Sequence, residues 1–238
     1  MPTKIEKLEA HASHLLDAFI ALQERYALLE PMLFNVDVPR IRGSFKQARG
    51  FMILRHSLFL STCQDIAKLT RDTDPRTPSI SNLLRALENP TVHEYLRERY
   101  SNWHVPLVEA ETDPQIVEAI RHLELNETAE NRIRFDKVFE ESKAKFGMLL
   151  TSSAIEACHS IRDKLSAHTE VRYVADKYEL LDISKLGLKW GDLGGSIKAM
   201  EELVSNLGLL IRNAAFAWDM LDVELKKAST EFWLPPTT

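Results

Sequence analysis

Apolar residues recur three or four positions apart along most of the chain, which is the pattern of amphipathic α-helices. No segment keeps the apolar/polar alternation of a strand between glycine-rich turns. We expect long helices over residues 4–30, 44–69, 126–165 and 196–225, and two shorter ones over 80–88 and 92–100. The predicted fold class is therefore all-α: an antiparallel helical bundle of four or five main helices with a short helical insertion.

Prolines and glycines mark the expected breaks between these helices. Pro31 is predicted to end the first helix, and the two prolines of 71–78 predict a loop. Further breaks are expected over 103–114 and in the glycine-containing section 169–195. No linker is long or polar enough to force a second domain, so a single domain over 1–238 is predicted.

Composition narrows the class of protein. Of 238 residues 45% are apolar, with 8 Gly and 10 Pro, which excludes disordered and collagen-like chains. The net charge of −5 argues against a surface that attracts nucleic acid everywhere, so a nucleic-acid site would have to be a small, focused cleft. Cys63 and Cys158 lie in apolar stretches and are expected to be reduced core thiols. Without a signal sequence or an apolar run of about 18 residues, a cytoplasmic protein with no membrane partner is predicted.

The segment RDKLSAH, residues 162–168, carries the most informative chemistry. Arg162 stands between the apolar and polar sides of its helix, where a guanidinium can reach a phosphate at the edge of a cleft. Six positions along an ideal helix turn a side chain by about 600°, roughly 120° from its starting face, and raise it about 9 Å. Arg162 and His168 cannot meet on an unbroken helix, so either the helix ends near Ser166 or two chains build the site.

This segment resembles the motif of the HEPN superfamily, the "higher eukaryotes and prokaryotes nucleotide-binding" helical domains: an Arg, a polar residue, a short gap and a His. Its RDK start and AH end are most similar to the AbiU-type, abortive-infection branch. The resemblance implies a metal-independent endoribonuclease without a cofactor, acting in phage defence or as a toxin. It also implies a homodimer with both motifs in one cleft, RNA as the substrate, and an inhibitor or antitoxin encoded nearby.

Metal-independent RNA cleavage needs a base for the 2′-hydroxyl proton, an acid for the leaving 5′-oxygen and a cation for the charge on phosphorus. We assign the base to His168, the cation to Arg162 and the acid to His168 of a second chain. Supporting roles are expected for four residues: orientation for Asp163, a neighbouring phosphate for Lys164, and a place beside the motif helix for Arg55 and His56. Each of these four can also be an ordinary surface side chain.

Two other classes of protein fit the same residues. A HEPN-like module can use Arg162 and His168 to bind nucleotide, RNA or protein without cleaving, and a structural helical protein can hold the motif by chance. HEPN toxins paired with a nucleotidyltransferase carry a Tyr three residues after the motif His, where this chain has Val171. Control by modification of such a tyrosine is therefore not expected. The remaining histidines form no metal-ligand pattern, and no metal is predicted.

Overall fold

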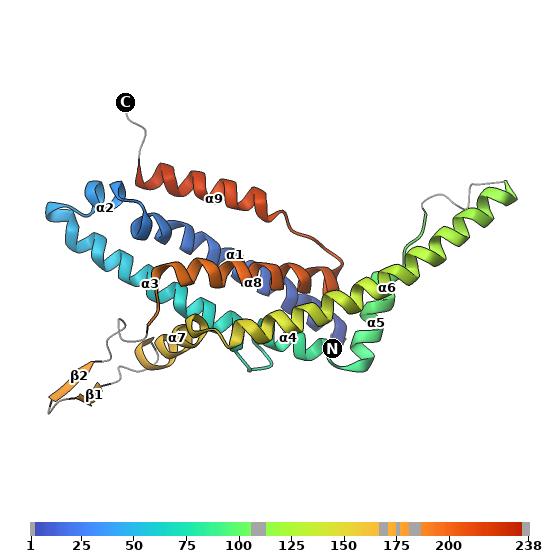
Figure 1. Ribbon diagram of the computed structural model, residues 1–238, viewed down its shortest axis with the longest axis horizontal. Helices are drawn as coiled ribbons and strands as arrows, with labels where there is room; N and C mark the ends of the chain where they lie inside the picture. The colour runs from blue at the N-terminus through green and yellow to red at the C-terminus, as the bar shows by residue number, and fades with distance from the viewer. Residues whose placement is uncertain (1–2, 106–112, 167–170, 175–176, 181–186, 235–238) are drawn as a thin grey trace.

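The computed structural model describes residues 3–105, 113–166, 171–174, 177–180 and 187–234. It confirms the all-α fold class, with successive long helices running in opposite directions (Figure 1). The long helices are α1 (Lys4–Phe34), α3 (Ala48–Arg71), α6 (Pro114–Leu150), α8 (Trp190–Arg212) and α9 (Trp218–Trp233). The shorter helical elements are α2 (Asp37–Arg42), η1 (Phe45–Gln47), α4 (Ile80–Leu87), α5 (Pro90–Ser101), α7 (Ser153–Ile161) and the π-helical turn η3 (Arg162–Ser166). A small antiparallel hairpin, β1 (Val171–Val174) with β2 (Lys177–Leu180), is an addition that the sequence did not predict.

The end of α1 differs from the prediction, because Pro31 lies inside the helix rather than after it. A proline has no N–H, so the carbonyl of Ala27, four residues earlier, loses its helical donor. Ser229 of α9 takes over this role, and its Oγ donates to the Ala27 oxygen at 2.5 Å. The helix can continue past Pro31 because a side chain from another helix satisfies the freed carbonyl.

Two predicted long helices are each divided in the structure. The expected helix over 126–165 starts earlier, at Pro114 of α6, and is interrupted before α7, where Ser152 accepts a hydrogen bond from the Ile155 N–H as an N-cap. The expected helix over 196–225 begins at Trp190 and is interrupted after Arg212 by the C-cap residue Asn213, whose φ of 51° is left-handed. Apolar spacing continues across both breaks, so the periodicity alone does not reveal them.

The second predicted helix, over 44–69, is α3, which starts at Ala48 and ends at Arg71. The short turn η1 replaces its first residues, and α2 precedes this turn. The predicted loop over 71–78 is confirmed: it separates α3 from α4, and Ser79 caps α4 by accepting from the Asn82 N–H.

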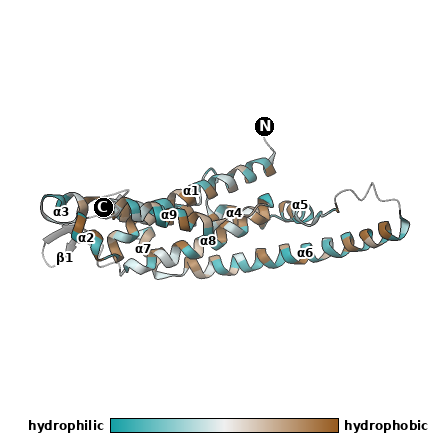
Figure 2. Ribbon diagram, turned by 90° about the horizontal axis from the view of Figure 1, so that it is seen from above, coloured by the Kyte–Doolittle hydropathy of each residue, from teal (hydrophilic) through white to brown (hydrophobic). Residues whose placement is uncertain are grey.

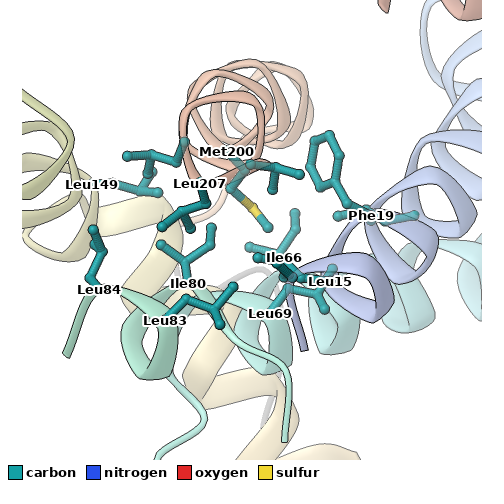
Figure 3. Packing of buried hydrophobic residues seen from close by; sticks show 14 of the residues in the cluster. Leu15, Phe19, Ile66, Leu69, Ile80, Leu83, Leu84, Leu149, Met200 and Leu207 are labelled. Carbon is teal, nitrogen blue, oxygen red and sulfur yellow. The ribbon is translucent and has the colours of Figure 1, made fainter. Parts of the chain in front are cut away.

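The core lies where α1, α3, α4 and α8 meet (Figure 3). The predicted insertion is part of this core, because α4 buries its apolar face against the long helices. The labelled side chains that meet there are Leu15, Phe19, Ile66, Leu69, Ile80, Leu83, Met200 and Leu207. Their burial fixes the position of α3, against which α7 and η3 then pack.

Helix α6 is buried mainly in its second half, through Phe135, Phe139, Ser142 and Leu149. Its first half extends beyond α5 in both views (Figures 1 and 2). The second half packs against α5 and α8 and leads the chain to α7, which packs against α3. None of the described helices has the length and apolar character needed to cross a bilayer.

Candidate functional site

Helix α7 is fixed against α3 by its buried face. The thiol of Cys158 on α7 lies next to that of Cys63 on α3, and both cysteines are free and buried. The interaction with the neighbouring Cys158 thiol, followed by burial, raises the pKa of the Cys63 thiol. The predicted reduced core thiols are therefore confirmed, and they help to set where α7 ends.

Arg162 is the first residue of η3, directly after α7. Single π-helical turns are rare in proteins overall, and those that occur are often found at functional sites. The Arg162 side chain is 36% exposed, and its Nε lies 3.7 Å from the Asp163 Oδ1 of the adjacent residue. At that distance the ion pair is loose, so the guanidinium keeps N–H donors available for an anionic group.

His159 was not singled out as a site residue from the sequence, yet it lies beside Arg162. It is half-buried one turn earlier on α7, with its Nε2 3.5 Å from the Thr70 Oγ1 of α3. Burial lowers the pKa of His159, the cations of Arg71 and Arg162 lower it further, and the Asp163 carboxylate opposes them. The imidazole is therefore neutral at pH 7. Its three-residue spacing from Arg162 was the signal that could have identified it.

Arg71 is a second cation at this place. It is the exposed last residue of α3 and directly follows Thr70, and no ion pair joins it to a carboxylate in the described part of the chain. Its charge acts on His159, as does that of Arg162. Sequence reasoning missed Arg71 because it comes from a different helix, and only the packing of α3 on α7 brings the two cations to one imidazole.

The other predicted site residues are placed as follows. Asp163 is exposed beside Arg162, and Lys164 is partly exposed one position further on. Helix α3 packs against α7 and η3, but among the described residues no hydrogen bond or ion pair joins Arg55 or His56 to Arg162. Arg55 instead donates from Nη2 to the Met52 sulfur at 3.1 Å, and the α3 side chain next to His159 is Thr70, at the C-terminal end of α3.

His168 lies outside the described residues. The element η3 extends to Ser166, the residue near which the spacing argument placed a helix break. Across the described ranges, no group of three or more His, Cys, Asp or Glu side chains could hold a metal ion.

A bundle of antiparallel helices that carries an Arg directly after one helix, with a His six positions further along the sequence, has the features of a HEPN domain. The model of the HEPN AbiU2 family, described as AbiU2, matches residues 5–232. The chain therefore belongs to this family of abortive-infection-related HEPN proteins, as the motif predicted. Comparisons with curated proteins and with solved structures gave no significant match.

Proposed function

We propose that this protein is a metal-independent endoribonuclease of HEPN type that acts in phage defence or as a toxin. The observation that carries the proposal is the Arg162 guanidinium, which is accessible in the π-helical turn after α7 and, among the described residues, has only a loose ion pair to Asp163. Family membership supports the same assignment, because it comes from a match over nearly the whole chain rather than from the motif alone.

The reaction divides between a base, an acid and a cation. His168 takes the proton of a ribose 2′-hydroxyl, and the 2′-oxygen forms a bond to the adjacent phosphorus. The bond from phosphorus to the 5′-oxygen of the next nucleotide breaks, and that oxygen receives a proton from His168 of the second chain. Arg162 donates hydrogen bonds to the phosphoryl oxygens, where negative charge develops. The products are a 2′,3′-cyclic phosphate and a 5′-hydroxyl.

The two-chain site is the arrangement that the resemblance to HEPN ribonucleases favours. On an ideal helix about 120° of rotation separates Arg162 from His168, so the two residues meet either where the helix ends or across two chains. A homodimer with both motifs in one cytoplasmic cleft supplies an acid and a base from equivalent residues. Such an activity endangers its own cell, which is the reason to expect an inhibitor or antitoxin encoded nearby.

Arg71 and His159 extend this site. Among the described residues no ion pair engages the exposed Arg71 guanidinium, which supplies a second contact for the phosphate backbone of RNA. His159, neutral between two arginines, is a positioning residue that leaves both cations free to bind anions. We expect Arg71→Ala to weaken RNA binding by about 3-fold to 10-fold, the value of one ordinary, solvent-exposed hydrogen bond. The matched control Arg76→Ala leaves affinity unchanged, because Arg76 is already paired with Asp74 in the 71–78 loop.

Replacement of His168 by alanine tests the proposal. The nuclease model predicts that His168→Ala loses cleavage of labelled RNA by about 100-fold or more while keeping RNA affinity and the helical circular dichroism spectrum. A binding module gives RNA affinity without cleavage in the unsubstituted protein, and a chance motif gives neither. The control is His122→Ala, because His122 is an exposed residue of α6 and lies outside the RNA-cleaving site. This variant should retain full activity. Light scattering that shows only monomers at high concentration contradicts the two-chain site.

A further inference from the structure

Helix α9 is attached to the rest of the bundle near its two ends. At its start, Trp218 packs edge-on against Phe19 of α1, with ring centroids 5.5 Å apart. Toward its end, Ser229 bonds to the Ala27 carbonyl, and Trp233 Nε1 donates to the Leu28 carbonyl at 2.9 Å. The middle of α9 lines a cleft of about 730 Å³ whose other walls are α1 and α8. This volume is in the range of small-molecule sites.

The floor of the cleft holds a buried amide with an unpartnered oxygen. Gln23 and Glu201 are only 6% and 7% exposed, and Gln23 Nε2 donates to Glu201 Oε2 at 2.9 Å. Because the amide nitrogen must face the carboxylate, the orientation of Gln23 is fixed. Its Oε1 is then buried without a hydrogen-bond partner among the described residues. A buried acceptor of this kind requires a donor, since leaving it unpaired is costly.

A second polar group of the cleft, the Tyr26 hydroxyl, also lacks a hydrogen bond in the described structure. It lies so close to α8 that a Cβ on Gly194 would be 2.7 Å from it, so only glycine leaves room for it. Burial first, and then the nearby Glu30 carboxylate, raises the pKa of Tyr26 to about 12. The hydroxyl therefore stays neutral, and its oxygen can accept a hydrogen bond.

The charges of the cleft favour a cationic ligand. Glu30, Glu201 and Asp222 face two lysines, Lys198 and Lys226, which leaves one negative charge in excess. Lys198 is already engaged, because its ammonium donates to Glu201. Two free oxygen acceptors and excess negative charge suit a group that has several N–H donors and a positive charge, which is what an alkyl ammonium provides.

We propose that this cleft binds a small aliphatic amine, whose ammonium group donates to Gln23 Oε1 and Tyr26 Oη while its methylene chain lies along Ile197 and Leu225. This function is separate from the RNA-cleaving site, because none of the residues that line the cleft belongs to α7 or η3. The alternative that the orphaned oxygen is satisfied by water alone is an outcome of the test.

Calorimetric titration of the full chain with 1,4-diaminobutane tests the proposal, with 1,4-butanediol as the uncharged ligand of the same length. We expect saturable binding of the diamine and none of the diol. Tyr26→Phe and Asp222→Asn each weaken diamine binding by about 3-fold to 10-fold, the value of one hydrogen bond or partly screened charge. Glu224→Gln, which removes an exposed carboxylate of α9 outside the cleft, leaves affinity unchanged.

Gly194→Ala is the sharpest variant, because its Cβ would press on the Tyr26 hydroxyl and displace it. We expect it to weaken the diamine by at least about 3-fold. Its circular dichroism and unfolding curve show whether it folds, and Tyr26→Phe tests the same contact if it does not. The proposal is overturned by no saturable binding up to about 10 mM diamine, by equal binding of the diol, or by cleft variants that behave like Glu224→Gln.

Discussion

Two regions of the molecule use helix α3 in opposite ways. One is the buried contact of α1, α3 and α8, and the other is the site at α7 and η3 that contains Arg162. In the first region α3 contributes Ile66, which is fully buried among apolar side chains. In the second it contributes Thr70 and Arg71, which lie beside a half-buried histidine and leave a guanidinium exposed. The buried region fixes the positions of the helices. The region at α7 and η3 exposes positive charge on helices that are held in this way.

This contrast separates residues that maintain the fold from residues that act on a ligand. A buried apolar side chain contributes through the area it removes from water and the cavity it fills. An exposed guanidinium with a loose partner contributes little to folding, so its conformation is free to serve binding. Substitutions should therefore lower stability in the first region and activity in the second.

The largest effect on stability is expected for Phe19→Ala, in the region of buried contacts. Phe19 is completely buried and packs edge-on against Trp218, so its removal leaves a cavity. We expect a loss of about 3–5 kcal/mol in the free energy of unfolding, measured by urea denaturation. Phe34→Ala, at a residue that is 51% exposed on the same helix, should cost less than about 1 kcal/mol. Equal losses would contradict the assignment of the core.

A smaller effect is expected where α9 satisfies the carbonyl freed by Pro31. Ser229→Ala removes the donor to the Ala27 oxygen and should lower the free energy of unfolding by about 1–2 kcal/mol. In a Pro31→Ala background the backbone regains an N–H that can donate to this oxygen, so the same substitution should cost less than about 0.5 kcal/mol. A double-mutant cycle with no coupling would show that Ser229 does not compensate for Pro31. Thr230→Ala, which removes an exposed hydroxyl bonded within α9, is the control.

The pH dependence of stability reports on His159 at the motif end. Its pKa lies below 6.5 in the folded state, so below that pH the unfolded chain binds a proton that the folded chain does not. Stability is therefore full above pH 6.5 and falls as the pH is lowered through the folded pKa. His159→Gln should make this fall shallower in urea unfolding between pH 7 and 5. Burial also lowers the pKa of His11, but His11 is present in both the unsubstituted protein and His159→Gln. An unchanged dependence of stability on pH in His159→Gln would therefore contradict the burial of His159.

The smallest effect on stability is expected for Arg162→Ala. Its side chain is more than a third exposed and its ion pair is loose, so the free energy of unfolding should change by no more than about 0.5 kcal/mol. A loss comparable to that of a buried residue would make Arg162 a structural residue and would remove the contrast between the two regions.

The helical periodicity was sufficient to predict the fold class, because buried positions such as Leu15, Phe19 and Leu22 recur on one side of a helix. It was insufficient for helix ends, which depend on single interactions. The Ser152 cap and the left-handed Asn213 divide helices whose apolar spacing is continuous. The end of α1 depends on Ser229, which is far away along the chain, so no local pattern contains it.

The candidate site was predictable only as far as its residues are neighbours in sequence. Arg162, Asp163 and Lys164 could be proposed from the motif, and His159 was within reach one turn earlier. Arg71 becomes a neighbour only through the packing of α3 on α7, which the Cys63–Cys158 contact helps to fix. A sequence pattern does not encode which residues of α3 meet α7, so Thr70 and Arg71 were not singled out, and the supporting roles of Arg55 and His56 stay a prediction.

The chemistry of the RNA ends distinguishes metal-independent attack by the 2′-hydroxyl from other routes of RNA cleavage. Mass spectrometry of a defined RNA oligonucleotide incubated with the protein and a metal chelator should show fragments with 2′,3′-cyclic phosphate and 5′-hydroxyl ends. The same oligonucleotide with deoxyribose throughout should stay intact, and Arg162→Ala should slow cleavage of the RNA by about 100-fold or more. No cleavage, cleavage that stops when metal is chelated, or fragments with 3′-hydroxyl ends would contradict the account.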